Sequence, residues 1–266
     1  MMAKVKKYSF KRYRKYIIPV LVLLAVAEGA GLACGASLAR LQEGLFKGVA
    51  FFGYMFPPDW SAFSEMLQPA FQSIIIAFLG TVFGTLLSVV FAMLAASNLS
   101  NSWVRNITRF LIGLERSVPE IVILLLLIAA FGLGAMPGII ALALGCVGML
   151  GKLLADVIEE IDYKMIESME SVGANKMQVI VFGVLPQIIP NLISYALFRF
   201  EINIRLSVIL GAVGAGGIGY ELDYSFGMLQ YHRAFTAMLV IIVMIFGTEH
   251  LSNILREKIK VGGALK

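Results

Sequence analysis

Six runs of apolar side chains, separated by shorter polar segments, occupy most of this sequence. A helix of about 20 apolar residues crosses a bilayer core of about 30 Å and satisfies its own backbone hydrogen bonds. Hydrophobic residues make up 59% of the chain and charged residues only 15%, a composition unlike that of soluble domains. We therefore expect an all-α membrane protein with about six transmembrane helices. The expected spans are residues 17–38, 70–96, 118–133, 139–154, a run that begins near 190, and 234–248.

Lysine and arginine are distributed unevenly around these runs. Seven of them precede the first run, within residues 1–16, and such positive charge keeps a segment in the cytoplasm. Six crossings with both termini inside would place 17 of the 22 basic residues on the cytoplasmic side. We therefore predict a cytoplasmic N-terminus (1–16), a transmembrane domain (17–255) and a cytoplasmic C-terminal tail (256–266). Membrane orientation accounts for the net charge of +5, so no nucleic-acid partner is expected.

Residues 39–69 form the longest segment between runs on the outer side. Apolar side chains recur there at near-helical spacing with little charge, which favours a helix lying in the membrane interface. Pro57 and Pro58 are expected to end that helix, since proline cannot continue it.

Small residues inside the runs indicate close helix packing. Gly80 and Gly84 are four residues apart, on one face of the second span, and such a pair lets another helix approach closely. Cys34 and Cys146 fall inside apolar runs, have no metal-ligand spacing, and are expected to be small core residues.

The fifth run is unusual because it contains charged residues, in the sequence FRFEINIR. Each charge in the membrane core costs about 2.5–3.5 kcal/mol unless it is paired or hydrated. Glu201 and Arg205 are four apart, so we expect an ion pair within the helix. Arg199 then needs another partner, and Glu28 and Glu120 are the candidates. The two arginines either hold the helices together or line a path taken by an anion.

The sequence contains no complete motif for catalysis, metal binding or nucleotide binding. Gly214, Gly216 and Gly219 match G-x-G-x-x-G, but no βαβ unit precedes them. Gly151-Lys152 is the nearest approach to a phosphate loop, and it lacks both the first glycine and the Ser or Thr. We expect no catalytic residue, no metal and no cofactor bound by this chain, so any nucleotide that drives it must bind to another protein.

The segment between the fourth and fifth runs, about residues 156–187, is polar and cytoplasmic in this arrangement. Gly173 permits backbone conformations that are closed to other residues, and Pro186 suits the first turn of a helix. The pattern therefore predicts a helix, a sharp turn and a second helix, in a position where another protein can dock.

This segment resembles the EAA loop of ABC importer permeases, in which Glu, two small residues, Gly and Leu-Pro recur at fixed spacing. The sequence departs from the pattern with Ser168 and Met169 in place of alanines and Gly183 in place of isoleucine. What the resemblance implies is contact with an ATPase subunit through Glu167, Ser168, Met169, Gly173, Ala174, Leu185 and Pro186.

Four further stretches, FPPDWS, RSVPE, FRFEINIR and LGAVGAGGIG, are similar to permeases of phosphonate-type importers; RSVPE and the glycine-rich stretch are also similar to methionine importer permeases. The phosphonate-type resemblance implies a type I ABC importer permease in the bacterial cytoplasmic membrane. Its partners would be a second copy of the chain, two cytoplasmic ATPase subunits that bind ATP and Mg, and an extracytoplasmic substrate-binding protein.

The function that this resemblance implies is a path for phosphonate, phosphite or a phosphate ester, opened by alternating access. The residues expected to line the path are Arg116, Glu120, Arg199, Glu201, Asn203 and Arg205. Two alternatives remain at this stage: a methionine-type amino-acid importer, and an ion-coupled carrier that works alone and transports without ATP.

Overall fold

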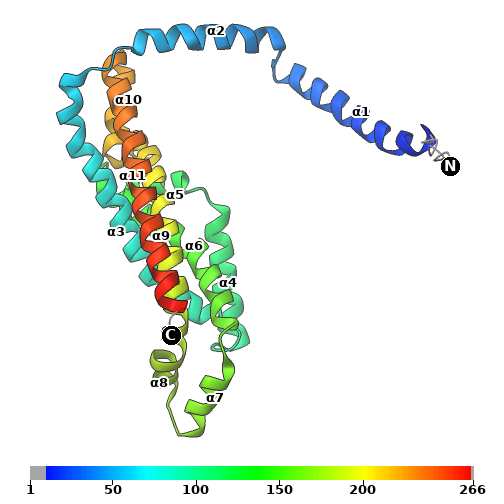
Figure 1. Ribbon diagram of the computed structural model, residues 1–266, viewed down its shortest axis with the longest axis vertical. Coiled ribbons are helices and arrows are strands. Elements are labelled where there is room, and N and C mark those ends of the chain that lie inside the picture. Colours follow the sequence, from blue (N-terminus) through cyan, green and yellow to red (C-terminus); the bar gives the residue numbers. More distant parts are fainter. Residues whose placement is uncertain (1–9, 265–266) are drawn as a thin grey trace, which may run out of the picture. The chain divides into compact units, whose positions relative to one another are not determined.

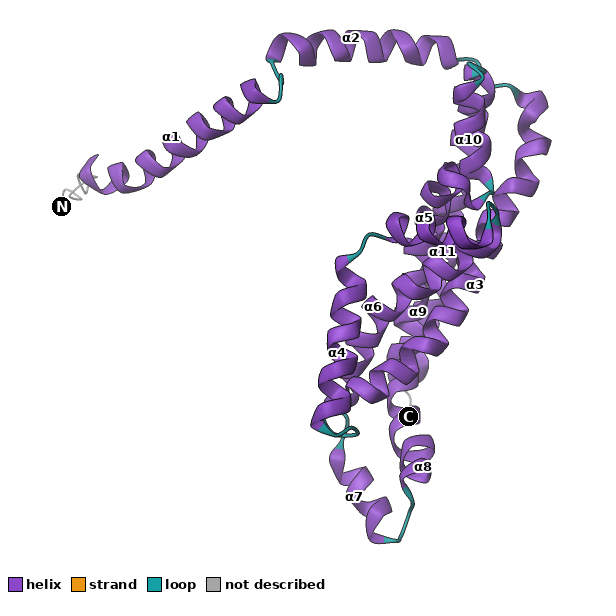
Figure 2. Cartoon of the chain, turned by 180° about the vertical axis from the view of Figure 1, so that it is seen from behind, coloured by secondary structure: helices purple, strands orange, loops and turns teal. Residues whose placement is uncertain are grey.

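A computed structural model describes residues 10–264 of the chain, and throughout that range the regular structure is helical, with no strand (Figure 2). The chain divides into two compact units, Met1–Phe56 and Pro57–Lys266. The expected all-α architecture is confirmed.

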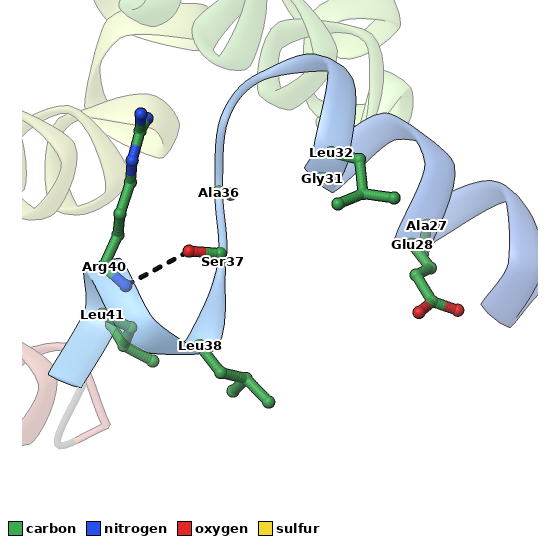
Figure 3. A pocket seen from close by; sticks show the side chains of 9 residues that line it. All are labelled: Ala27, Glu28, Gly31, Leu32, Ala36, Ser37, Leu38, Arg40 and Leu41. Atoms are coloured by element: carbon green, nitrogen blue, oxygen red, sulfur yellow. Dashed lines mark hydrogen bonds between the residues drawn. The ribbon is translucent and has the colours of Figure 1, made fainter.

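The first unit contains α1 (Phe10–Ala33) and α2 (Leu38–Met55). Ser37 is the N-cap of α2, and its hydroxyl accepts a hydrogen bond from the Arg40 amide at 3.2 Å (Figure 3). The Arg40 guanidinium donates instead to the Gly35 carbonyl at 2.9 Å, and Glu28 points away from it. The first span ends near Ala33, earlier than predicted, because Gly35 has a φ of +69° that interrupts the helix. Cys34 is exposed in this turn, so its predicted core position was wrong.

The second unit holds the other helices. They are α3 (Phe63–Ala95), α4 (Ser102–Ser117), α5 (Glu120–Phe131), α6 (Ala135–Glu159), α7 (Tyr163–Ser171), α8 (Lys176–Gln178), α9 (Leu185–Leu210), α10 (Ile218–Gly227) and α11 (Tyr231–Ala264). Short turns of 3₁₀ helix (η1, Trp60–Ala62) and π-helix (η2, Val179–Val184; η3, Gly211–Ala215) complete it. Helices α3, α6, α9 and α11 pack together as the bundle, and α7 and α8 project from the end where α11 finishes (Figure 1).

Five helical stretches within residues 10–264 are long and apolar enough to cross a membrane. They are Lys15–Ala33, Trp60–Ala95, Ala135–Glu159, Lys176–Ala215 and Tyr231–Lys258. The last four extend beyond the predicted apolar runs. A helix continues into polar residues once its packing is established, so the apolar run marks only its central part.

The predicted third span, 118–133, is the exception. Helix α5 has 12 residues and reaches about 18 Å, too short to cross alone. The segment before it, one of the polar segments between the expected spans, forms α4, which packs on α6 and buries Ile112. The break lies at Val118, which is extended (φ −102°, ψ 120°) because it precedes Pro119. Two shorter helices in series, α4 and α5, thus replace the single predicted span.

Helices α3 and α6 make the most extensive contact in the unit, and glycine permits it. A Cβ on Gly80 would lie 2.7 Å from the Leu142 Cβ, and one on Gly84 would overlap Cys146. The predicted close approach at this pair is confirmed, and the partner helix is α6. Cys146 is buried there, as expected.

The glycine-rich stretch 211–219 also brings backbones into contact. Gly217 lies against Ser73, whose hydroxyl accepts a hydrogen bond from the Ile218 amide at 3.0 Å. A Cβ on Gly219 would overlap the Val208 carbonyl. The stretch therefore folds back on α3 and α9.

Candidate functional site

The polar segment between α6 and α9 (residues 163–184) contains α7 and α8, and we call it the α7–α8 insert. It turns sharply at Gly173. The Gly173 amide donates to the Glu170 carbonyl at 2.9 Å, and the Ala174 amide donates to the Met169 carbonyl at 3.0 Å. These two bonds, with φ +87° at Gly173, form a Schellman motif. The predicted helix, turn and helix are confirmed.

A capping box fixes the start of the helix that follows the turn. The Asn175 side chain accepts from the Gln178 amide at 2.9 Å, and the Gln178 side chain accepts from the Asn175 amide at 2.8 Å. This reciprocal capping box satisfies two backbone donors that a helix start leaves free. With both ends of the turn fixed by hydrogen bonds, the insert has a defined shape before any partner binds.

The two faces of the insert differ in chemistry. Ile166 and Val179 are buried against the end of the bundle, whereas Val172, Met177 and Phe182 are exposed. Val172, at the tip, is 84% exposed. An apolar group of this kind on a rigid projection is typical of a protein contact surface.

The predicted coupling residues are spread over both faces. Glu167, Ser168, Gly173 and Pro186 are exposed, and Pro186 lies in the first turn of α9 as predicted. Three others, Met169, Ala174 and Leu185, are half-buried and pack on the core cluster at this end of the bundle.

A polar cavity of about 280 Å³ lies at the break between α4 and α5. It is lined by residues 115–120 together with Gly145, Met149 and Arg199. Gly145 is near the middle of the α6 span, so the cavity lies at membrane depth. Three predicted path residues meet here: Arg116, Glu120 and Arg199.

Arg199 is the buried charge of this cavity, and only 5% of the residue is exposed. Its Nη2 donates to Glu120 Oε1 at 3.3 Å, and its Nη1 lies 3.8 Å from the Met149 sulfur. Its Nε is buried and has no hydrogen-bond partner. Of the two candidates for its partner, Glu120 is confirmed. The pairing leaves part of the guanidinium's hydrogen-bonding capacity unused.

Glycines of α6 make the space for this polar group. A Cβ on Gly145 would lie 2.6 Å from Arg199 Nη2, and one on Gly148 would overlap the Glu115 carboxylate. Glu115 was not among the residues predicted from the sequence to line the path. The spacing of Gly145, Gly148 and Gly151, three apart in an apolar span, is the signal that could have located it.

Asn203 does not line the cavity. It is fully buried and donates from Nδ2 to Thr81 Oγ1 at 2.9 Å and to the Cys146 sulfur at 3.3 Å. These bonds connect α9 with α3 and α6, so the structure places Asn203 in the packed interior of the bundle.

Glu201 and Arg205 lie on the side of α9 that faces α11. Arg256 pairs with Glu201, and Arg205 Nη2 lies 3.3 Å from Glu249 Oε2. The ion pair predicted within α9, between Glu201 and Arg205, was therefore wrong, because each residue finds a partner on the neighbouring helix. The structure does not bring either residue together with Arg199 at the cavity.

No group of His, Cys, Asp or Glu among the described residues has a metal-binding arrangement. Gly151 and Lys152 lie inside α6, whereas a phosphate loop precedes a helix.

The family model of the binding-protein-dependent transport system inner membrane component matches residues 88–260, which include both the cavity and the insert. The chain belongs to this family. It is a multi-pass membrane protein with the architecture of a type I importer permease.

Relatives in this permease family are similar over much of the chain. The phosphite transport system permease PtxC of Stutzerimonas stutzeri is 37% identical over 221 residues, covering 83% of this chain and 80% of that protein. The phosphate-import permease PhnE of Mycolicibacterium smegmatis is also 37% identical, over 220 residues, covering 81% of this chain and 41% of that protein.

The fold of the permease is also similar to that of solved transporters. A structure of the MetNI methionine ABC transporter in inward-facing conformations superposes with a TM-score of 0.65 at 20% identity, covering 76% of this chain and 99% of that chain. At this identity the match supports the fold alone.

Proposed function

We propose that this chain is the permease subunit of an ATP-binding-cassette importer and forms the path for a small phosphorus oxyanion such as phosphite, a phosphonate or a phosphate ester. The observation that carries the substrate class is Arg199, a buried guanidinium in the middle of the bundle with an unpartnered Nε beside a polar cavity. The two relatives named above, a phosphite transport permease and a phosphate-import permease, support the same substrate class.

A guanidinium suits such a substrate because its planar fork donates two parallel hydrogen bonds to phosphorus-bound oxygens. Arg116 lines the same cavity and adds a second positive charge. An arriving oxyanion would share Arg199 with Glu120 or displace it, so binding in the path is weak enough for release. High affinity would then reside in the extracytoplasmic binding protein.

Transport by this proposal is driven from the α7–α8 insert. Two ATPase subunits, which bind ATP and Mg, dock on the inserts of two permease copies and move them as their own dimer closes. Because the insert is held by its Schellman motif and capping box, it transmits that motion to α6 and α9 as a rigid body. The path thereby opens alternately to the binding protein and to the cytoplasm.

The proposed setting is the bacterial cytoplasmic membrane, with both termini in the cytoplasm. The insert and the C-terminal end of α11 lie at the same end of the bundle, which is the arrangement that this orientation requires (Figure 1).

The test is uptake by the complete complex in liposomes, with the binding protein and ATP supplied on their proper sides. We expect ATP-dependent accumulation of phosphite or a phosphonate, and none of methionine. Methionine uptake would establish the amino-acid alternative. Uptake by the permease alone without ATP would establish an ion-coupled carrier.

A further inference from the structure

A second cavity, of about 250 Å³, lies between α4 and α6 on the insert side of the first. Arg116 lines both cavities, so the two are neighbours that share one guanidinium. The second cavity also contains Arg109 and Gly113 from α4, and Lys152 and Asp156 from α6. We call this cavity the α4–α6 groove.

We propose that the α4–α6 groove is the exit site for the transported anion, with Arg116 receiving the oxyanion from Arg199 and Lys152 receiving it next. This inference rests on the proposed function, since it assigns a second binding position to the same substrate.

The charges of the groove support this sequence of contacts. Arg109 is engaged, because its Nη2 lies 2.6 Å from Glu159 and its Nε donates to the Ala95 carbonyl at 2.9 Å. Neither Arg116 nor Lys152 forms an ion pair with any residue that the structure describes. Even Asp156, one turn from Lys152 on α6, does not pair with it. Two cations thus remain available at successive positions along the groove.

The charged residues of the groove and the apolar residues suited to lipid lie on different faces of α4. Arg109, Gly113 and Arg116 recur at the spacing of one face of α4. The opposite face carries the exposed apolar residues Ile107, Leu111 and Leu114. Because apolar side chains already supply the surface suited to hydrocarbon, the charged face is suited to water and an anion.

Gly113 allows a direct test without removing any cation. A Cβ at this position would meet nothing within 4 Å, so Gly113→Cys is accommodated in α4. Cys34 is replaced by Ser because it is exposed, and the buried Cys146 is kept. The complete complex is reconstituted in liposomes of zwitterionic lipid. Modification of the thiol introduced by Gly113→Cys is then timed with an anionic and a cationic methanethiosulfonate reagent of similar size.

We expect the anionic reagent to react faster by about threefold or more, because a narrow groove lined by cations concentrates anions. Inorganic phosphite should slow the reaction. Lys152→Gln should remove most of the preference, and Asp156→Asn should increase it. Lys258→Gln, which removes an exposed lysine on α11, is the matched control and should leave the rates unchanged.

Measurements of uptake distinguish a failure of the exit site from a failure of the proposed function. Lys152→Gln should reduce phosphite uptake several-fold, while the loaded binding protein still stimulates ATP hydrolysis. If the unmodified complex carries no phosphorus oxyanion, the proposed function fails. If it does carry one, but the introduced thiol shows neither charge preference nor phosphite protection, only the exit site fails. Protection that appears only with phosphatidylglycerol in the liposomes would assign the groove to a lipid headgroup and overturn the exit site.

Discussion

Arg199 and Glu120 face each other across α9 and α5, with 3.3 Å between Nη2 of the arginine and Oε1 of the glutamate. The two side chains differ in burial, since that of Arg199 is 6% exposed and that of Glu120 is 31% exposed. Glu120 is therefore the partner that water or an anion reaches first. In the proposed function, Glu120 neutralises Arg199 in the empty path, and an arriving oxyanion competes with it for the guanidinium.

Replacing Glu120 with Gln should destabilise the empty complex and strengthen anion binding. Removing one partner of a fully buried pair costs about 3–5 kcal/mol, and because Glu120 is partly exposed we expect about 1–2 kcal/mol. Thermal unfolding of the purified complex measures the loss. Added phosphite should raise the unfolding temperature of Glu120→Gln more than that of the unsubstituted protein, because the anion then meets an unpaired guanidinium.

Glu65→Gln is the control for this prediction. Glu65 Oε2 lies 2.8 Å from Arg233 Nη1, but its side chain is 60% exposed, so its loss should change stability by less than about 1 kcal/mol. Equal responses of Glu120→Gln and Glu65→Gln to phosphite would contradict the role of Glu120.

The pair between Glu201 and Arg256 should behave as a structural element. Both residues are largely buried, so Arg256→Gln leaves a carboxylate without its partner and should cost about 2–3 kcal/mol. Glu201→Gln combined with Arg256→Gln should recover much of that loss, since no uncompensated charge remains. Unfolding temperatures of the two single variants and the double variant measure the coupling. Additive losses would show that the pair contributes little.

Local patterns in the sequence predict the helices of the bundle and the turn of the insert well. Apolar runs identify the centres of α3, α6, α9 and α11, because burial in lipid or core requires them. Gly173 and Pro186 mark the turn and the next helix through properties of their own backbones. These features depend on residues close together in the chain.

Features that depend on partners distant in the chain were not predictable in the same way. Glu201 pairs with Arg256, 55 residues away, although Arg205 stands one turn along its own helix. Helix α4 was not predicted, because its buried face is recognisable only when α6 lies against it. The cavity was missed as a unit for the same reason, since Gly148 makes room for Glu115 from another helix.

Adding a side chain at Gly84 should disrupt the contact between α3 and α6. A methyl group there would overlap Cys146 and the Ala143 carbonyl, and both of these residues are buried. We expect Gly84→Ala to destabilise the protein by about 1–3 kcal/mol. Gly247→Ala is the matched control, because a Cβ on Gly247 in α11 meets nothing within 4 Å, and alanine favours a helix by up to about 1 kcal/mol. Thermal unfolding should therefore separate the two variants, and an unchanged Gly84→Ala would contradict the tight α3–α6 contact.

Substitutions at Gly173 should be tolerated or not according to how readily the new residue adopts a positive φ, and not according to the size of its side chain. A Cβ there meets nothing within 4 Å, but φ is +87°, a conformation that costs most residues about 1–2 kcal/mol. Asparagine adopts it more readily than a β-branched residue. We therefore expect Gly173→Asn to keep most of the binding-protein-stimulated ATP hydrolysis and uptake, and Gly173→Val to lose both while the chain still inserts into the membrane. Equal activity of the two variants in the reconstituted complex would show that the shape of this turn does not couple ATP hydrolysis to transport.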